Sequence, residues 1–375
     1  MIGPSPINGC DVPENATTNE HGFRLYEWPG GNTDLHREYG ADQPATVISV
    51  TASRSVVGIP FQLQAWQLAN VVNLATGQRR AEWRDYSKST RGRLVKGYKK
   101  DGPFPGEFVL RMVATEGNEE KLTAVRAWLK QTADEPRDIA AVRGSVVHKM
   151  IEMRVPLKAL SEEVIRWYVD QQWVTEKRSV LPTVTDEDVD FVGDCVANYW
   201  DMREAVPFVI IAQEPQVWNL AVGYAGSADV LIWFLPFGER SRQKHWQEQA
   251  DKGNVTAELI GHIGGHTALG DWKTSPEVYT GHVVQGTAYL AATFIGRNGE
   301  IDERLTRILR GTMRGLIIKI RPDGWETDTF EYREDVAMAF FGQIALARFL
   351  MKYDKPVELF TETISGTAPT SWRPE

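Results

Sequence analysis

The sequence is poor in cysteine and has no long apolar run. Cys10 and Cys195 are its only two cysteines, too few for a four-cysteine zinc or iron–sulfur site, and we expect both to be free thiols. No stretch reaches the roughly 18 consecutive apolar residues of a membrane span, and the N-terminus lacks the charged-then-apolar layout of a secretion signal. The sequence therefore predicts a cytoplasmic protein with no iron–sulfur cluster and no membrane partner.

Internal repeats and low-complexity blocks are absent as well, which argues against a solenoid or a fibrous protein. The chain has 375 residues, 42% of them hydrophobic, and 13 tryptophans. That is enough apolar surface for a sizeable core, so the length predicts one large globular domain or a core with an insertion.

Acidic residues outnumber basic ones, 50 against 42, so the formal net charge is −8, but positive charge is dense in residues 79–100. That segment carries nine Lys or Arg residues against Glu82 and Asp85, with Trp83, Tyr86 and Tyr98 between the charges. Such a mixture suits a surface that neutralises phosphates and stacks bases, although a solvated basic loop has the same composition. The predicted DNA-binding side chains are Arg79, Arg80, Arg84, Arg91, Arg93, Lys96, Lys99 and Lys100.

The residue pattern divides the chain into four parts. Residues 1–45 are rich in Gly, Pro and Asn and predict a loosely ordered lead, whereas residues 46–139 predict a basic region with helices over 53–78 and 119–133. Residues 140–355 predict an α/β core in which 161–205 is a helical insertion, with Thr185 as the N-cap of its second helix. Residues 356–375 form a tail rich in Thr, Ser and Pro.

Within the core, three β-rich segments are expected over residues 208–220, 224–236 and 257–275. A helix follows over 278–294, then strands over 314–320 and 325–332, and a last helix over 335–352. The predicted fold class is therefore α/β.

Acidic residues stand at two places in these β-rich segments. Asp271 and Lys273 alternate across Trp272, so a strand would present both side chains on one face, about 7 Å apart. Asp229 follows small residues and precedes an apolar run. Neighbouring acids beside a lysine can hold Mg²⁺ or Mn²⁺, and a structural Asp–Lys salt bridge is the alternative.

Two further pairs have helical spacing. Gln285 and Tyr289 are four residues apart and could orient a phosphate or a base, or could be ordinary helix-surface residues. His148 and Glu152 are also four residues apart, in a helical pattern after Gly144; His148 could be a third metal ligand or a structural histidine, and Glu152 could be a solvated helix acid.

Two other motifs fit less well. Gly265 and Gly270 have the separation of a phosphate-binding loop, but the lysine comes two residues late. His262 and His266 have the spacing of zinc ligands, but their surroundings are rich in glycine and predict a loop.

Taken in order, these residues resemble the PD-(D/E)XK nuclease superfamily, and specifically the RecB-like exonucleases of bacteriophage type. The resemblance covers about residues 140–295. It rests on "GSVVH" (His148), "AQEPQVW" (Glu214), "GYAGSAD" (Asp229), "GDWKT" (Asp271, Lys273) and "QGTAY" (Gln285, Tyr289). This chain has Asp271 where many relatives have Glu, and it lacks the four cysteines that hold an iron–sulfur cluster in several of them.

The resemblance implies a restriction-endonuclease-like core, that is, a mixed central sheet flanked by helices, with the strand of Asp229 beside that of Asp271 and Lys273. It implies a metal-dependent DNA exonuclease that acts in phage DNA recombination, repair or degradation. The protein would work in the host cytoplasm and could have a recombination or single-strand-binding protein as partner. Mg²⁺ or Mn²⁺ would be held by His148, Asp229 and Asp271. Lys273 would activate water, Gln285 and Tyr289 would line the site, and Glu214 would be a supporting acid. A structure-specific endonuclease and a non-catalytic DNA-binding protein on the same fold are the alternatives.

Overall fold

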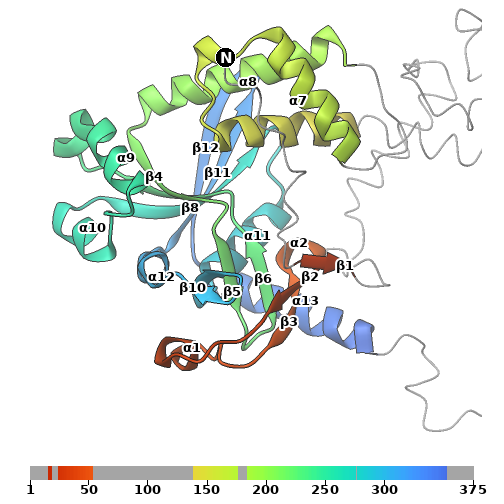
Figure 1. The fold of residues 1–375 in the computed structure, drawn as a ribbon, viewed down its shortest axis with the longest axis vertical. Coiled ribbons are helices and arrows are strands. Elements are labelled where there is room, and N and C mark those ends of the chain that lie inside the picture. Colours follow the sequence, from red (N-terminus) through yellow and green to blue (C-terminus); the bar gives the residue numbers. More distant parts are fainter. Residues whose placement is uncertain (1–15, 19–23, 54–137, 176–183, 276, 353–375) are drawn as a thin grey trace, which may run out of the picture.

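The structure is a computed structural model that describes residues 16–18, 24–53, 138–175, 184–275 and 277–352 (Figure 1). The expected helices over 53–78 and 119–133, the basic segment 79–100 and the tail 356–375 lie outside these residues, apart from Ser53. The described chain is mixed α/β, which confirms the predicted fold class.

A five-stranded mixed sheet forms the centre of the fold, in the order β12-β11-β8-β7-β4. Its strands β8 and β11 are parallel, and its other neighbours are antiparallel. Runs such as "VLIWF" and "LIIKI" are buried on both faces because helices cover both. The strands are β4 (Phe208–Gln213), β7 (Val230–Phe234), β8 (His266–Lys273), β11 (Arg314–Arg321) and β12 (Gly324–Glu331).

A second, seven-stranded sheet lies beside it, in the order β1-β2-β3-β6-β5-β9-β10. A single central sheet was expected, so this sheet is a correction to the predicted architecture. Its strands are β1 (Ala16–Thr18), β2 (Arg24–Trp28), β3 (Ala45–Ser49), β5 (Gln216–Asn219), β6 (Tyr224–Ser227), β9 (Phe294–Arg297) and β10 (Glu300–Ile301).

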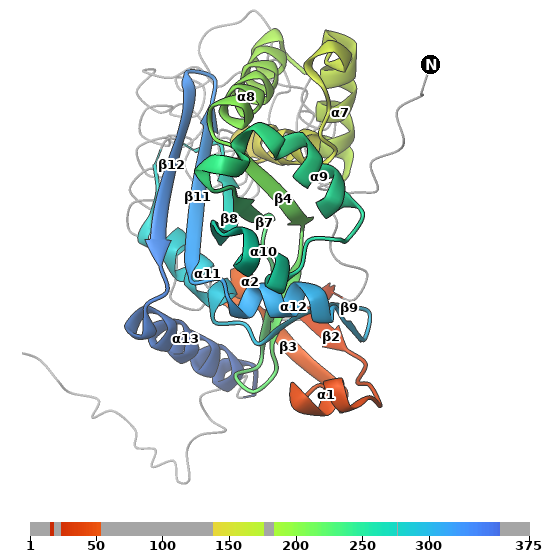
Figure 2. The same ribbon diagram turned by 90° about the vertical axis from the view of Figure 1, so that its left-hand side faces the viewer.

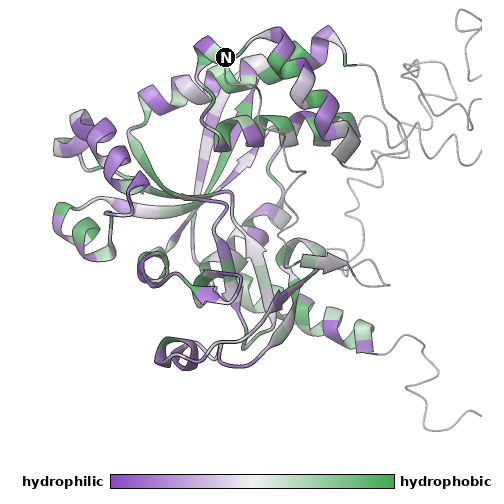
Figure 3. Cartoon of the chain, in the orientation of Figure 1, coloured by the Kyte–Doolittle hydropathy of each residue, from purple (hydrophilic) through white to green (hydrophobic). Residues whose placement is uncertain are grey.

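Helices pack on both faces of the five-stranded sheet (Figure 2). A helix over residues 138–152, α7 (Glu162–Thr175) and α8 (Asp186–Ala205) share one apolar core with the sheet. These helices carry hydrophobic and hydrophilic residues together, as expected for helices with one buried side (Figure 3). The helices of the second core are α9 (Gln243–Asp251), α10 (Ala257–Ile263), α11 (Thr280–Leu290), α12 (Glu303–Arg310) and α13 (Glu334–Lys352).

Short helical elements complete the described chain. They are α1 (Asp34–Glu38), α2 (Val50–Ser53) and the 3-10 turns η2 (Leu157–Ala159) and η3 (Phe237–Arg242). None of the helices in the described ranges is both long and apolar enough to cross a membrane.

The predicted start of α8 is confirmed. Thr185 accepts a hydrogen bond from the backbone N–H of Asp188, and the Asp188 carboxylate accepts one from the N–H of Thr185. This reciprocal arrangement satisfies backbone donors that an uncapped helix end leaves unpaired, and it is typically worth about 1 kcal/mol.

Residues 257–263 differ from the sequence prediction, because they form α10 rather than a strand or a loop. Thr256 caps this helix by accepting a hydrogen bond from the N–H of Leu259, and Gly264 ends it at a φ of 92°. Leu259, Ile260 and Ile263 then pack against the second core. Capping and packing therefore outweigh the glycine content of this stretch, and His262 lies in the last helical turn.

Residues 24–45, the part of the lead that the structure describes without a gap, are more ordered than predicted. Within residues 24–45, β2 and α1 belong to the packed fold, and Trp28 is 1% exposed. Trp28 Nε1 donates a hydrogen bond to the carbonyl of Ala41, and the indole packs edge-on against Trp218. The first residues of the region predicted to be helical form β3, which pairs with β6 of the core.

Candidate active site

The site begins where two chain segments pass from one sheet to the other. The first runs from β4 to β5 through Glu214, and the second runs from β6 to β7 through Asp229. The two crossings are joined by backbone hydrogen bonds, from the N–H of Glu214 to the carbonyl of Asp229 at 3.0 Å and from Ala228 to Pro215 at 3.2 Å. Glu214 has a φ of 48°, which lets the chain turn sharply there. The fold thus places two acids at one junction.

Asp229 lies beside the end of β8. Val230 pairs with Gly270 across the antiparallel β7–β8 ladder, so the predicted neighbourhood of these strands is confirmed, with Asp229 just before β7. Asp229 Oδ2 accepts a hydrogen bond of 2.6 Å from the backbone N–H of Trp272. Its side chain is only 15% exposed. The carboxylate is therefore held against the strand that carries Asp271.

Asp271 and Lys273 emerge on the same face of β8, as the strand pattern predicts. Lys273 Nζ lies 2.5 Å from Asp271 Oδ2, and the two side chains are 20% and 10% exposed. Asp271 Oδ2 is sheltered from solvent and has no hydrogen bond of acceptable geometry besides this ion pair. The salt-bridge interpretation of this pair therefore holds in this structure, and it does not exclude a catalytic one.

His148 reaches the same acids from the helix over 138–152. Its Nδ1 lies 3.7 Å from Asp229 Oδ2. The helix comes close to the end of β8, since a Cβ added at Gly144 would lie 3.0 Å from Thr274 Oγ1. Burial, and to a lesser extent the charge of Lys273, lower the pKa of His148 to about 4. The imidazole is therefore neutral at pH 7, the form that binds a metal.

Gln285 and Tyr289 approach from α11. Gln285 Nε2 donates a hydrogen bond of 2.8 Å to the Tyr289 hydroxyl, and both side chains are buried. They are therefore not ordinary helix-surface residues. Burial raises the pKa of Tyr289 well above its usual value, and the nearby Asp271 and Asp229 raise it further. The tyrosine thus faces the acidic pair.

The electrostatics of the site are dominated by negative charge. Burial raises the pKa of Asp229 well above its usual value, and the charges of Asp271 and Glu214 add to that increase. Lys273 opposes them. The carboxylates of Asp229 and Asp271 lie beside a single lysine, Lys273, where burial weakens solvent screening, and a bound cation would relieve the repulsion between the two acids.

Gly226 makes the close packing of Tyr289 possible. A Cβ at this position would lie 2.8 Å from Tyr289 Cε1 and 3.1 Å from Val50 Cγ2. We expect Gly226→Ala to lower the free energy of unfolding by about 1–3 kcal/mol, because the ring or the strand must move. Denaturant unfolding measures this loss, and Gly238→Ala, where an added Cβ meets nothing within 4 Å, is the control. Equal stability of the two variants would contradict the packing argument.

The acids of the site do not form a complete metal-binding cage. Among the described residues, no group of three or more His, Cys, Asp or Glu side chains is arranged to hold a metal ion. The donor chemistry nevertheless fits Mg²⁺ or Mn²⁺, which take one or two carboxylates and complete their shell with water. Asp229 and Asp271 supply such oxygens, and Asp271 Oδ2 has no hydrogen-bond donor besides the Lys273 ammonium group.

Sequence reasoning missed one neighbour of the site, Tyr26 on β2. Burial raises the pKa of Tyr26, and its hydrogen bonds to Ser227 and Arg24 oppose that shift. Glu214 is close enough to raise the pKa of Tyr26 as well. The run "RLYEW" over 24–28, in which Tyr26 and Trp28 alternate with Glu27, was the signal that could have revealed this strand.

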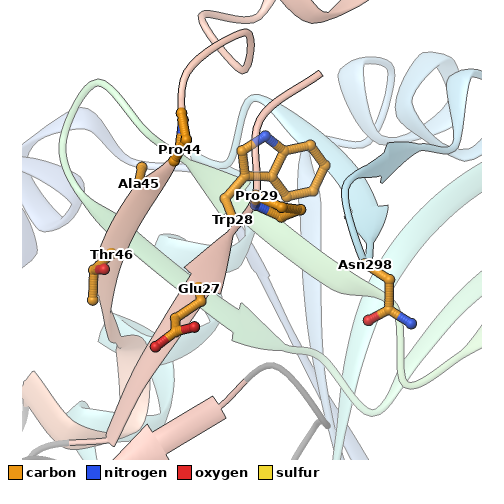
Figure 4. A pocket seen from close by; sticks show the side chains of 7 residues that line it. All are labelled: Glu27, Trp28, Pro29, Pro44, Ala45, Thr46 and Asn298. Carbon is orange, nitrogen blue, oxygen red and sulfur yellow. The ribbon is translucent and has the colours of Figure 1, made fainter. Parts of the chain in front are cut away.

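A separate groove of about 480 Å³ lies along β2 and β3 (Figure 4). It contains none of the predicted site residues. The lining residues are Glu27, Trp28, Pro29, Pro44, Ala45, Thr46 and Asn298.

Comparison of the whole chain with models of known protein families and with curated proteins finds no match.

Proposed function

We propose that this protein is a divalent-metal-dependent DNA nuclease of the PD-(D/E)XK type, similar to RecB-like exonucleases. The observation that carries the proposal is the convergence of the residues that form the family pattern. Three separate elements bring His148, the pair Asp271 and Lys273, and the pair Gln285 and Tyr289 into the neighbourhood of Asp229, at the junction of the two sheets.

In this proposal the chain positions a phosphodiester and a water molecule above the end of β8. Lys273 orients the attacking water and stabilises the negative charge that develops on the phosphoryl oxygens. Its ion pair with Asp271 keeps the ammonium group in place. Gln285 and Tyr289 form the wall beside Asp271, and Glu214 supports the segment that carries Asp229.

Asp229 and Asp271 would hold the metal, with neutral His148 as a third ligand. A divalent ion at this position supplies Lewis acidity to the phosphate and lowers the pKa of the attacking water. The hydrogen bond from Trp272 N–H fixes one oxygen of Asp229, so the carboxylate is oriented before any ligand arrives.

DNA as substrate is supported by the density of positive charge in residues 79–100, which lie outside the described structure. Holding a polyanion near three carboxylates requires a local positive surface, because the chain as a whole is acidic. The same residues would also suit two alternative functions, an endonuclease and a DNA-binding protein without catalytic activity.

Labelled DNA tests the proposal directly. The purified protein is incubated with linear DNA labelled at the 5′ or the 3′ end and with a covalently closed circle, in Mg²⁺ or Mn²⁺. We expect degradation of the linear strands, no change in the circle, and complete loss of activity with EDTA, because the acidic pair needs a cation.

The same assay separates the alternatives. Cleavage of the circle would indicate an endonuclease, and binding without cleavage in either metal would indicate a non-catalytic DNA-binding protein. Cleavage that survives EDTA would exclude the metal-dependent mechanism.

A further inference from the structure

A second polar cluster lies behind the candidate active site, where the chain following the helix over 138–152 meets α8 and α9. Three of its donor atoms are buried without an acceptor: Arg154 Nε, the Tyr199 hydroxyl and Arg203 Nη1. Tyr199 itself is 1% exposed. Buried donors normally have a partner, since leaving one unpaired costs about 1–3 kcal/mol.

The three residues are neighbours. Tyr199 and Arg203 are four residues apart on α8, and the charges of Arg203 and Arg154 both act to lower the pKa of Tyr199. Burial lowers the pKa of Arg203, and the charge of Arg154 lowers it further, so the two guanidinium groups repel each other. Hydrogen bonds from Arg154 to Asp251, from Gln247 to Asp251 and from Arg203 to Gln247 link the two cations, so the cluster brings them together beside the Tyr199 hydroxyl.

Within the part of the chain that the structure describes, one of these cations has a carboxylate partner and the other has none. Arg154 Nη1 lies 2.8 Å and 3.0 Å from the two carboxylate oxygens of Asp251. Among the described residues, Arg203 Nη2 donates to Gln247 Oε1 at 3.3 Å and forms no ion pair with a carboxylate, and its guanidinium lies 4.5 Å from the centre of the Phe208 ring. Two arginines against one aspartate leave one net positive charge.

We propose that Arg154, Tyr199 and Arg203 bind one small inorganic anion of single charge, such as chloride. An anion accepts from all three donors and neutralises the excess charge. A water molecule could accept from two of them, but it would leave the charge uncompensated and add two donors of its own.

The site is adjacent to the strand that carries the candidate catalytic residues. The Tyr199 ring packs edge-on against Trp272, with centroids 5.7 Å apart and an interplanar angle of 88°. Trp272 lies between Asp271 and Lys273, and its N–H holds Asp229. A bound anion therefore stabilises the contact of α8 with β8. This inference does not depend on nuclease activity.

Thermal unfolding in different salts tests the anion site. Melting temperatures of the full chain are compared in sodium chloride, sodium bromide and sodium gluconate at equal ionic strength, without DNA or divalent metal. We expect the two halides to raise the melting temperature by at least about 2 °C over gluconate, since a ligand that binds only the folded state stabilises it. Arg203→Met should lose this difference.

Arg242 offers a matched control. Its guanidinium also lies over an aromatic ring, 4.9 Å from the centre of Trp246, but it is paired with Glu239 at 3.0 Å. Arg242→Met should therefore keep the halide effect. A halide effect that persists in Arg203→Met would place the anion elsewhere and overturn the proposal.

Bromide also gives a readout that needs no variant. Crystals of the wild-type protein grown in bromide should show an anomalous peak within hydrogen-bonding distance of Arg203 Nη1 and the Tyr199 hydroxyl. Equal melting temperatures in all three salts together with no such peak would show that water, or nothing, fills the cluster.

Discussion

Replacing Lys273 by methionine should reduce DNA cleavage by at least about 100-fold while leaving DNA binding nearly unchanged. The reason is that a group acting on charge developed in the transition state contributes to the chemical step and little to substrate binding. The long apolar stem of methionine fills the same space, so the fold should be preserved. Single-turnover cleavage of linear DNA and a separate binding titration in Ca²⁺ measure the two effects.

Lys319 provides the matched control for this variant. It pairs with Lys273 in the parallel β8–β11 ladder, but its Nζ is engaged by Glu326 at 2.6 Å and Asp328 at 3.1 Å. Lys319→Met should keep most of the cleavage activity. If Lys273→Met cleaves as fast as Lys319→Met, then Lys273 is a structural salt-bridge partner only.

Replacing Asp229 by asparagine should have opposite effects on activity and on stability. Cleavage should fall by at least about 100-fold, because a carboxylate that is the proposed metal ligand is lost. In metal-free buffer at pH 7, however, the variant should be more stable than the wild type. Asparagine can still accept the hydrogen bond from Trp272 N–H, and it removes a buried charge beside Asp271 and Glu214.

The pH dependence follows from the direction of the Asp229 pKa shift. The pKa is raised in the folded state from its ordinary value of 3.8, so folding takes up protons. The stability that protonated Asp229 contributes is fully present below the pKa of Asp229 in the unfolded chain. It is lost as the pH rises through the higher pKa of Asp229 in the folded protein. Melting temperatures in EDTA should therefore fall with rising pH above about pH 4 in the wild type relative to Asp229→Asn.

Addition of Mg²⁺ or Mn²⁺ should remove the difference in melting temperature between the wild type and Asp229→Asn, because the metal should bind and stabilise only the wild type. A variant that is less stable than the wild type in EDTA at pH 7 would show that Asp229 is a structural acid. A variant that retains full activity would show that the metal is held by other residues.

Local features of the site could be predicted because they depend on short-range periodicity. Residues two apart on a strand share a face, so the order Asp-x-Lys was sufficient to place Asp271 beside Lys273. Residues four apart on a helix are neighbours, which is why Gln285 meets Tyr289. Thr185 could be recognised as a helix cap because capping involves only the next three residues.

Other features depend on contacts between distant segments. Periodicity placed Gln285 and Tyr289 on one side of a helix, but only packing of α11 against the sheets buries that side. Residues 257–263 became a helix because the second core accepts their apolar side chains. The strand β2 is stabilised by pairing with β3 and by the burial of Trp28, neither of which a polar, glycine-rich lead reveals.

The sequence by itself thus determined which side chains of each element stand together, because the geometry of a helix or a strand repeats within a few residues. Only the tertiary structure decided that Glu214 and Asp229 meet where two segments cross between sheets. It also decided that His148 comes within 3.7 Å of Asp229. The distances between these elements are set by sheet order and by the packing of two apolar cores, and both arise only when the whole chain folds.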